Sequence, residues 1–554
     1  MLLPPSIVSR ISPLLALFPL VGAFSLTPVL AQSITPATDG TETVVTPQGN
    51  RFNITGGKTS ADGTNLFQSF SQFGLNTGQI ADFQSNPAIQ NILGRVVGGN
   101  ASIINGLIQV SGSQANLYLM NPAGIVFGRD AQLNVPASFF ATTATGIGFG
   151  NNWFNTTGVN DYAALVGTPS TFAFTTTVPG AIINSGNLAV KEGQNLTLLG
   201  GTVTNTGEIS APGGQITLSA VPGDSVVRLS QTGHLLSLDI QPRGQSSTAN
   251  SIPFTPLSLP ELLTGGTGDH ATGLTVNNDG TVQLTGGINI PTDPGTTIVA
   301  GKLDTSLIQG GVGGTVNFLG DKVGVIGGNI DVSGTNGGGR VLLGGDYQGK
   351  GAVPNASRSY ISSDSVINAN SLVDGNGGHV VVWADQLTGF YGNISARGGA
   401  NSGNGGFVEV SGKENLQFAG VVDTLAPNGQ VGTLLLDPKN ILIQAGGADP
   451  VLGNSLFGDN PTGTSIISGA NLSAAINQGN VTLQANNDIT IADNITGNTA
   501  GNGLTLQAGR SIIINANNII RLNGGNFRAT INDQRAALLN RDPGAAEFTF
   551  SGVA

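Results

Sequence analysis

Short runs of alternating hydrophobic and polar residues recur along most of the chain. Between residues 188 and 221, each run alternates Ile, Leu or Val with Ser, Thr or Asn. In a β-strand this alternation places the apolar side chains on one face. Gly, Asn-Thr-Gly or Pro-Gly-Gly separates successive runs, and these residues are typical of tight turns. The pattern therefore predicts many short strands joined by turns.

The runs belong to a repeated unit of the form NxGxIxAxGGxIxLxA. Related copies occupy residues 276–290, 326–345, 391–412 and 504–519. One copy cannot bury its apolar face alone, whereas stacked copies share a continuous core. We therefore predict an all-β fold, a right-handed parallel β-helix that forms a single-stranded solenoid. Roughly twenty coils, about 4.8 Å apart, would give a rod on the order of 100 Å long. A β-sandwich would use similar residues but would not need near-copies of one unit.

Two segments interrupt the repeat. Residues 241–263 are rich in Pro and Ser and predict a loop that leaves the rod. Residues 469–479 predict a short helix, because Leu472, Ala475 and Ile476 share one helical face and Gly479 ends the stretch. The sequence stops within a predicted strand, so we expect a product that is truncated at this end.

Composition narrows the class of protein. The 554 residues are too many for one compact core. They include 85 Gly, 39% hydrophobic residues and only 10% charged residues. Disordered chains are more charged and less apolar, and collagen requires Gly at every third position. A β-rich repeat with many tight turns remains.

Charge and cysteine content bear on partners and compartment. The formal net charge is −11. No basic stripe or cluster is present to hold phosphate groups, so we predict no nucleic-acid partner. The chain contains no Cys, so disulfides cannot lock it in an oxidising compartment. This property is expected of a chain that crosses an outer membrane unfolded.

Residues 1–31 have the pattern of a signal peptide. Arg10 supplies the positive charge and residues 11–24 the apolar region. Small or medium residues precede the favoured cleavage site, which lies after Ala31 and leaves Gln32 as the first residue of the mature chain. A membrane anchor is the weaker interpretation, because prolines at positions 13, 19 and 28 interrupt the apolar run.

The segment from residue 33 to about 179 differs from the repeat by its bulkier core, since it holds over half of the Phe residues. In residues 66–83, Phe recurs at intervals of three, which predicts either a helical turn or a capping segment. Residues 92–112 and 114–149 each read as strand, turn and strand. In the second of these, Asn121-Pro122-Ala123-Gly124 has the residues of a type I β-turn.

Three ordered pieces of this segment carry a family resemblance. They are SNPAIQNILGRVVGGNASIINGLI, ANLYLMNPAGIVFG and SFFATTA. Residues 33–150 thereby resemble the secretion domain of two-partner-secreted exoproteins, the filamentous-haemagglutinin family of large bacterial adhesins. The two Asn-Pro signatures of that family fall at Asn86-Pro87-Ala88-Ile89 and at Asn121-Pro122-Ala123-Gly124-Ile125. In the strongest form of each signature, a second Asn stands where Ala88 and Ala123 stand here.

The resemblance implies a domain organisation and partners. After the signal peptide, residues 32–180 would be the two-partner secretion (haemagglutination activity) domain and residues 181–554 a β-helical passenger. The Sec machinery and an outer-membrane β-barrel transporter would export the chain from a Gram-negative-type bacterium. An adhesin-like role at the cell surface or in the medium would follow, with host-surface or extracellular carbohydrate or protein as ligand. The residues expected to form the secretion motif are Asn86, Pro87, Asn121, Pro122, Gly124 and Ile125.

Two glycine-rich stretches invite ligand assignments that their residues do not support. Residues 344–351, GGDYQGKG, satisfy most of the P-loop spacing, but Gly351 stands where Ser or Thr must bind magnesium. Residues 310–318, GGVGGTVNF, are similar to the calcium-binding nonapeptide, but Thr315 stands where that motif needs Asp. We interpret both as turns and predict no metal and no cofactor.

Residue types that perform catalysis are scattered along the sequence. His234, His270 and His379 lie in different repeats, so no zinc site is predicted. Polysaccharide lyases and hydrolases also use β-helices, and they need acids clustered on one face. The acids that would have to align are Asp331, Asp346, Asp374, Asp385 and Asp423. We interpret these as solvated acids and predict no enzymatic activity. A secreted carbohydrate-active enzyme and a stalk for a module beyond residue 554 stay as alternatives.

Overall fold

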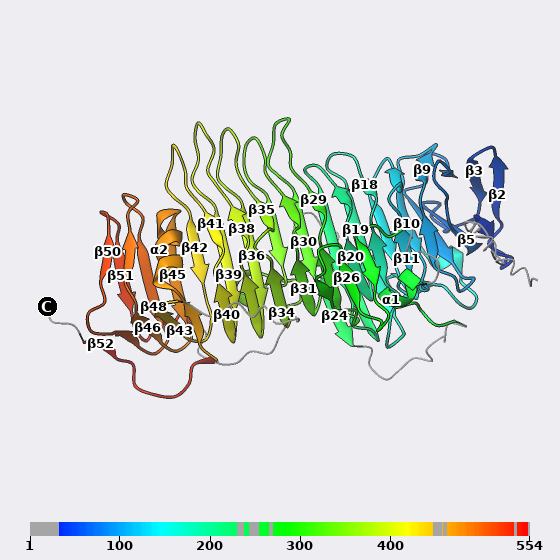
Figure 1. The fold of residues 1–554 in the computed structure, drawn as a ribbon. Coiled ribbons are helices and arrows are strands. Elements are labelled where there is room, and N and C mark those ends of the chain that lie inside the picture. The colour runs from blue at the N-terminus through cyan, green and yellow to red at the C-terminus, as the bar shows by residue number, and fades with distance from the viewer. Residues whose placement is uncertain are drawn as a thin grey trace, which may run out of the picture. The chain divides into compact units, whose positions relative to one another are not determined.

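In the computed structural model, the chain winds through three sheets in turn, with one strand in each sheet per coil (Figure 1). The structure describes residues 33–229, 238–242, 254–264, 270–446, 457, 463–536 and 540–551. Successive coils pair in parallel and in register. For example, β10 (Asn116–Met120) lies between β7 (Asn91–Val96) and β13 (Phe139–Thr142). The predicted parallel β-helix is confirmed.

Sheet 1 is the largest and contains 16 strands. Besides β7, β10 and β13, they are β1 (Thr35–Pro36), β4 (Lys58–Thr59), β5 (Asn65–Gln72), β19 (Asn195–Gly200), β22 (Gln215–Ala220), β30 (Thr315–Leu319), β33 (Arg340–Leu343), β36 (His379–Ala384), β39 (Phe407–Gly412), β42 (Thr433–Leu436), β45 (Asn480–Ala485), β48 (Leu504–Ala508) and β51 (Phe527–Thr530).

Sheets 2 and 3 complete the coils. Sheet 2 consists of β8 (Ser102–Ile104), β11 (Ile125–Phe127), β17 (Ile182–Asn184), β20 (Thr202–Asn205), β28 (Thr296–Val299), β31 (Lys322–Val325), β34 (Arg358–Ile361), β37 (Leu387–Phe390) and β40 (Asn415–Phe418). Sheet 3 consists of β2 (Thr43–Gln48), β3 (Arg51–Gly56), β6 (Ile80–Gln84), β9 (Leu107–Ser111), β12 (Gln132–Asn134), β18 (Asn187–Ala189), β21 (Glu208–Ser210), β29 (Lys302–Asp304), β32 (Asn329–Asp331), β35 (Val366–Asn368), β38 (Asn393–Ser395) and β41 (Val421–Asp423).

Nearer the C-terminus, two smaller sheets stand in for sheets 2 and 3. The first consists of β43 (Ile441–Gln444), β44 (Ser465–Ile467), β46 (Ile489–Ala492), β49 (Ile512–Ile514) and β52 (Phe548–Phe550). The second pairs β47 (Ile495–Gly497) with β50 (Ile520–Leu522).

A continuous apolar core fills the coils from Ile34 to Ile514. It forms because alternate side chains of each strand point inward. In β39, Val408 and Val410 are fully buried in this core, and Glu409 between them faces the outside of the coil. The period-two pattern of the sequence therefore corresponds to the inside and outside of the coil stack.

An antiparallel cap covers the N-terminal end of the stack. β1 pairs antiparallel with β5, and β2 forms a hairpin with β3, which then pairs in parallel with β6. Closing the end in this way leaves the first coil without an exposed sheet edge. An N-terminal cap is therefore present, and residues 35–56 form it rather than residues 66–83, where the sequence placed it.

Residues 66–83 lie in β5 and β6 and in the non-helical corner that joins these strands, so the alternative of a helical turn is wrong. Phe70 and Phe73 contact each other and Phe83 inside the first coils, with ring centroids 5.2–6.1 Å apart. Phe67 faces outward instead, against Phe149 and Phe154. Within β5, a spacing of three residues thus places Phe67 and Phe70 on opposite faces, whereas Phe73 lies just beyond the end of the strand.

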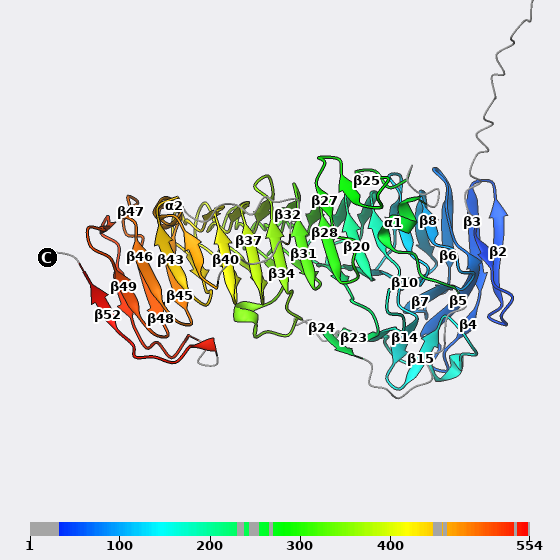
Figure 2. The same cartoon turned by 60° about the horizontal axis from the view of Figure 1, so that its bottom comes forward.

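A five-stranded antiparallel sheet lies on the outer face of the first coils (Figure 2). Its strands are β14 (Gly146–Phe149), β15 (Asn152–Asn155), β16 (Thr171–Phe174), β23 (Ser225–Leu229) and β24 (Leu238–Pro242), with η1 (Tyr162–Ala164) beside them. Phe67, Phe149, Phe154 and Phe172 are buried between this side sheet and the coils. This second apolar layer accounts for the concentration of Phe in the N-terminal part.

The predicted loop excursion returns to the rod over its described part. Residues 243–253 lie outside the described residues, and α1 (Leu259–Leu262) follows. Ser258 and Glu261 form a capping box at its start, where the Ser258 N–H donates to Glu261 Oε2 at 2.8 Å. A small sheet of β25 (Leu274–Val276), β26 (Val282–Leu284) and β27 (Asn289–Ile290) comes next. Both elements pack on the outer face of sheet 2.

The predicted helix near residue 470 is confirmed as α2 (Gly469–Asn477). The Ser468 side chain caps its start, and Leu472, Ala475 and Ile476 are buried. These side chains belong to the main core. The helix therefore replaces the third strand of one coil.

Candidate functional site

The Asn121 turn, residues 121–124, forms with the predicted geometry. The Gly124 N–H donates to the Asn121 carbonyl at 3.1 Å, which closes the β-turn. The Asn121 side-chain oxygen accepts the Ala123 N–H at 3.0 Å. Its Nδ2 donates to the Asn100 carbonyl at 3.0 Å and to Ser102 Oγ at 2.9 Å. Asn121 thus joins the turn to the previous coil.

The segment 254–264 covers this turn. The Leu257 N–H donates to the Ala123 carbonyl at 3.1 Å, and Leu262 lies over Gly124. Gly124 has φ +124°, and a Cβ there would approach Leu262 Cδ2 to 2.9 Å. The backbone conformation therefore favours glycine, and a larger residue would also displace the tip of the Leu262 side chain. Asn121, Pro122, Gly124 and the following Ile125 are all buried.

The Asn86 turn, residues 86–89, repeats this geometry on the surface. The Asn86 side-chain oxygen accepts the Ala88 N–H at 3.0 Å, and the Ile89 N–H donates to the Asn86 carbonyl at 3.1 Å. Asn86 and Pro87 are exposed, while Ile89 is buried. A hollow of about 490 Å³ beside the turn is lined by Pro87, Ile89, Gln90, Gly112, Ser113, Gln114 and Asn116. The two signatures therefore share a turn but differ in accessibility.

The remaining predicted residues, Ala31 and Gln32 at the signal cleavage site, lie outside the described residues. Ile125 begins β11 and pairs with Ser102 and Ile182 in the neighbouring coils. The part that the motif residues play in secretion stays a prediction.

A buried ion pair that sequence reasoning missed fastens the cap. Arg95 in β7 is 3% exposed, and its guanidinium donates to Asp39 Oδ2 at 2.8 Å. Asp39 also accepts Ser69 Oγ at 2.6 Å. Arg95 lies 5.3 Å from the Phe154 ring centroid and also bonds the Asn155 carbonyl in the side sheet. The pair therefore joins the N-terminal segment, the first coils and the side sheet. Asp39 and Arg95 are far apart in sequence, so no short sequence pattern predicts their contact.

A second buried group lies under residues 344–357, which we call the strap. The strap contains η3 (Tyr347–Gly349) and connects β33 to β34 across the outer face of sheet 1. The Gln348 N–H donates to the Glu409 carboxyl group at 3.1 Å, and Gln348 Nε2 donates to Asp437 Oδ2 at 3.1 Å. Glu409 is completely buried and Asp437 nearly so.

Burial raises the pKa of both acids. Desolvation and the neighbouring Asp437 raise the pKa of Glu409 to about 8, although the Gln348 N–H opposes the rise. Burial raises the pKa of Asp437 to about 7, against the opposing effects of Lys350 and Gln348. Because the strap closes the site, these acids are not accessible to a substrate. Neither residue stands out in sequence, since Glu409 occupies an ordinary outward position in β39 and Asp437 directly follows the end of β42.

Glu409→Gln is expected to reduce the pH dependence of stability around the strap. A raised pKa means that the folded chain keeps a proton that the unfolded chain releases above about pH 4.5. The contribution of this proton to stability is then full below that pH and is lost progressively as the pH rises from 4.5 through 8. In a Trp153→Phe background, the urea midpoint of Trp383 fluorescence measures this change. Glu192→Gln at an exposed site should keep the wild-type slope, and an equal slope in Glu409→Gln would contradict the assignment.

The acids considered for catalysis are distributed over different elements. Asp331 and Asp423 in sheet 3 each accept the N–H two residues ahead at 2.9 Å, as turn-forming Asp residues do. Asp374 accepts Ser402 Oγ, Asp385 accepts Trp383 Nε1, and Asp346 pairs with Arg340. His234 lies outside the described residues, and His379 stacks on Phe407.

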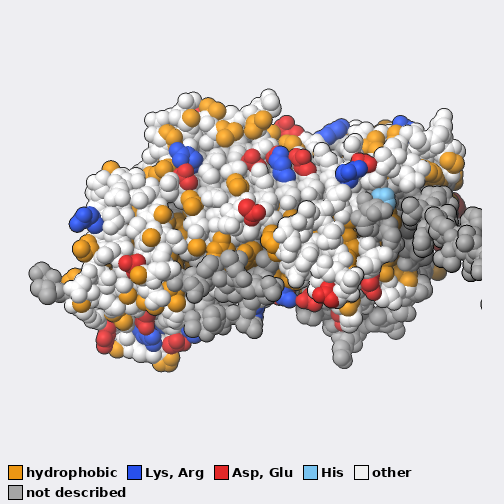
Figure 3. Space-filling model, viewed as in Figure 1, with side chains coloured by type: hydrophobic (Ala, Val, Ile, Leu, Met, Phe, Trp, Pro, Cys, Tyr) orange, Lys and Arg blue, Asp and Glu red, His pale blue; other side chains and the backbone are white. Residues whose placement is uncertain are grey.

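Within the described ranges, no three His, Cys, Asp or Glu side chains come together as metal ligands would. Across the same part of the chain, no helix has the length and apolar character needed to span a membrane. On the face seen in Figure 3, charged side chains of both signs are few and intermixed.

The structure thus defines a β-helical protein whose N-terminal end is closed by a cap, a side sheet and a covering segment. The family model of the TPS secretion domain matches residues 31–284. Among solved structures, the chain is similar to the HMW1 secretion domain from Haemophilus influenzae, at 23% identity over 73% of this chain and 99% of that chain, with a TM-score of 0.39. No curated protein matches the sequence.

Residues 31–284 therefore carry a two-partner secretion domain. Such a domain implies a two-partner-secreted exoprotein. Its partner is an outer-membrane transporter of the TpsB type, and its route crosses the outer membrane of a Gram-negative bacterium.

Proposed function

We propose that the N-terminal domain is both the export signal read by the β-barrel transporter and the nucleus on which the passenger folds. After Sec export and removal of residues 1–31, the unfolded domain would reach the transporter. The family match over residues 31–284 is the observation that carries this proposal. The cap supports it, because a closed N-terminal end leaves only the other end of the stack open for coils to add.

Folding outside the cell would then proceed coil by coil. Each coil pairs in parallel with the one before, so each completed coil offers a sheet edge that templates the next. Before folding, the same unpaired backbone groups can pair with a sheet edge of the transporter. Free energy released by each coil would oppose return to the periplasm, which contains no ATP.

The two Asn-Pro turns would have different roles. The Asn121 turn is enclosed once the domain has folded, so we assign it to shaping the coil. The Asn86 turn stays exposed beside its hollow, so a contact with the transporter can survive folding there. The covering segment 254–264 lies beyond the predicted boundary at residue 180. We propose that it belongs functionally to the secretion domain, with the rest of 181–554 acting as passenger.

For the exported rod we propose an adhesin-like surface role. Long polar outer faces suit contact with extracellular carbohydrate or protein. A carbohydrate-active enzyme is the second candidate. Glu409 and Asp437, two neighbouring acids with raised pKa values, are closed off by the strap. A stalk for a further module is the third, and the gene sequence downstream distinguishes it.

Deleting residues 33–150 behind an intact signal peptide is expected to trap the product in the periplasm. The deletion removes both Asn-Pro turns and the cap while leaving the repeats of the passenger. Fractionation of cells that carry the transporter, followed by immunoblotting, measures the distribution. A matched deletion of one passenger coil, residues 376–403, should still leave the cell. Normal surface delivery of the 33–150 deletion would overturn the proposal.

A further inference from the structure

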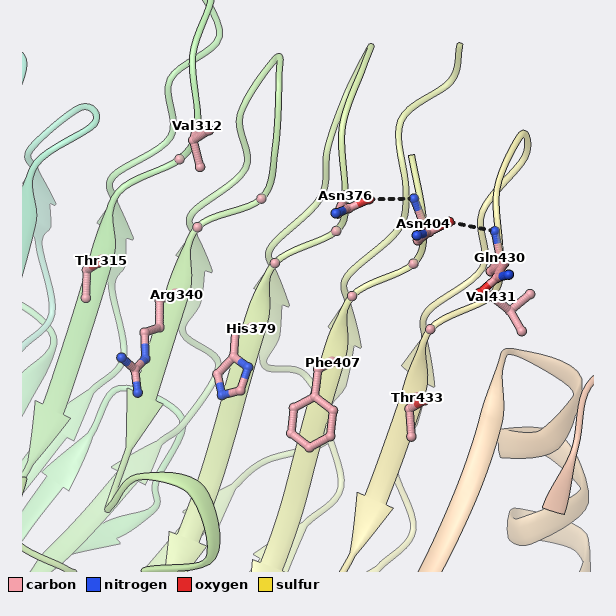
Figure 4. Close-up of a pocket in the computed structure, with 18 of the residues that line it drawn as sticks. Val312, Thr315, Arg340, Asn376, His379, Asn404, Phe407, Gln430, Val431 and Thr433 are labelled. Atoms are coloured by element: carbon pink, nitrogen blue, oxygen red, sulfur yellow. Dashed lines mark hydrogen bonds between the residues drawn. The ribbon is translucent and has the colours of Figure 1, made fainter. Parts of the chain in front are cut away.

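A groove crosses five successive coils at the start of sheet 1 (Figure 4). Its volume is about 690 Å³. One wall is a row of side chains that begin neighbouring strands in register: Thr315, Arg340, His379, Phe407 and Thr433. The groove therefore runs along the axis of the coil stack.

Glycine pairs form the floor, and packing alone explains them. A Cβ on Gly378 would lie 2.3 Å from the Gly339 carbonyl oxygen, and one on Gly406 would lie 2.2 Å from that of Gly378. The coils could not approach this closely with larger residues. The glycines therefore say nothing about a ligand, and the side chains above them must supply any recognition.

Asparagine amides form the opposite wall. Asn376 Oδ1 accepts the Asn404 N–H at 2.8 Å, and Asn404 Oδ1 accepts the Gln430 N–H at 2.9 Å (Figure 4). These bonds fix the orientation of both amides. Among the described residues, none accepts a hydrogen bond from either Nδ2 group, and both Asn are exposed. The wall thus presents oriented donors on neighbouring coils.

Two aromatic rings, His379 and Phe407, form part of the first wall, and Tyr347 lies beside Phe407. His379 stacks on Phe407 with centroids 5.0 Å apart, and Tyr347 meets Phe407 at 5.8 Å. Tyr347 belongs to the strap and is 44% exposed, and the hydrogen bond from the neighbouring Gln348 N–H to Glu409 fixes the backbone beside it. The rings form a partly exposed shelf, which suits a flat apolar face of a ligand.

The groove carries no net charge near neutral pH. Arg340 pairs with Asp346 at 2.6 Å. Burial and the neighbouring Arg340 lower the pKa of His379, so this side chain is neutral. The chain as a whole has a net charge of −11. An anionic ligand would therefore gain nothing from the groove and would be repelled by the protein.

An extended peptide is also a poor occupant, because the backbone donors of the floor are already used. The Gly377 N–H donates to the Asn404 carbonyl at 2.9 Å, and the Gly405 N–H donates to the Gln430 carbonyl at 2.9 Å. A peptide needs unpaired backbone groups to add as a strand. The groove offers side-chain amides and rings instead.

We propose that this groove binds an uncharged, hydroxyl-rich polysaccharide that lies along the coil stack. The apolar face of a sugar ring packs on the shelf of Phe407 and Tyr347. Its hydroxyl groups accept hydrogen bonds from Nδ2 of Asn376 and Asn404. The inference deepens the proposed surface role by naming a ligand class, and binding to the purified chain is independent of how that chain leaves the cell.

Isothermal titration of the purified mature chain tests this site. The probes are three neutral hexasaccharides (cellohexaose, maltohexaose and mannohexaose), anionic hexagalacturonate and the peptide hexaglycine. We expect saturable binding of at least one neutral probe and no binding of hexagalacturonate or hexaglycine. Phe407→Leu, which keeps the apolar contact but removes the ring, should weaken binding about tenfold. The pair Asn376→Asp and Asn404→Asp keeps the oxygen acceptors, removes the donors, and should weaken it about tenfold.

Two matched controls lie outside the groove. Phe527→Ala removes an exposed ring, and Asn278→Asp alters an exposed amide. Both should bind like wild type, and a urea midpoint for every variant verifies folding. Absence of binding by all three neutral probes would overturn the proposal. So would binding only of hexagalacturonate or hexaglycine, or wild-type affinity in the Phe407 and Asn variants.

Discussion

Replacing Asp39 with alanine is expected to lower the free energy of unfolding of the N-terminal part of the chain by about 3 kcal/mol. The reason is the position of Arg95, which is 3% exposed and would keep its charge without the carboxylate 2.8 Å away. Truncation also leaves Ser69 Oγ without its acceptor. Asp39 is itself a quarter exposed, which places the loss at the lower end of the range for a buried ion pair.

The same carboxylate sets a pH dependence. Burial alone would raise the pKa of Asp39, but hydrogen bonds from Ser69, Thr41 and Arg95 outweigh it and lower the pKa to about 2. Its contribution is therefore present above pH 3.8 and is lost as the pH falls toward 2. In the Asp39→Ala variant, this part of the pH dependence of the free energy of unfolding, between pH 3.8 and 2, should be absent.

Local fluorescence measures both effects. In a Trp383→Phe background, Trp153 in β15 reports urea unfolding of the side sheet that Arg95 joins to the cap. Asp293→Ala is the matched control, because its ion pair with Lys322 is on the surface, with Asp293 71% exposed. That change should cost at most about 0.5 kcal/mol. Equal losses in the two variants would show that Asp39 and Arg95 contribute no more than a surface pair.

Asn121→Ala is expected to cost about 3 kcal/mol, whereas Asn86→Ala should cost less than about 1 kcal/mol. Both Asn residues cap the same kind of turn, with a side-chain oxygen 3.0 Å from the N–H two residues ahead. Only Asn121 is fully buried and also donates to Asn100 and Ser102. Removing the Asn121 side chain leaves the buried Ser102 hydroxyl without its donor and the Ala123 N–H without its acceptor.

The same urea titration compares the two variants, because each turn lies in the part of the chain that Trp153 reports on. Asn86→Ala serves as the control for loss of an Asn-Pro turn at the surface. If transporter contact rather than folding is the role of Asn86, its alanine variant should lose export while keeping its urea midpoint. Similar midpoints for Asn121→Ala and wild type would contradict the architectural role of the buried turn.

Much of the fold could be predicted because the strand alternation and the repeated unit can be recognised within short stretches of sequence. Alternation within 188–221 predicts strands, and near-copies of one unit predict stacked parallel coils. The Asn121 turn follows from residue types with well-defined turn chemistry. The helix at 469–477 follows from its apolar face, although its place as part of a coil depends on the neighbouring strands.

Long-range contacts could not be predicted in this way. The return of 254–264 over the Asn121 turn joins residues more than one hundred positions apart. The strap places Gln348 on Glu409, and only the coil register brings Asp437 beside them. The helical turn considered for residues 66–83 was wrong because a three-residue Phe spacing fits a helix as well as a strand. In the structure, Phe67 packs in the outer apolar layer and Phe70 in the inner core.

The central claim is that the N-terminal domain directs export through a dedicated transporter. Its most direct test is the fraction of the intact chain and of the 33–150 deletion found outside cells, measured with and without the transporter. We expect the intact chain outside only where the transporter is present, and the deletion inside in both cases. Release of the intact chain without the transporter, or of the deletion with it, would contradict the account.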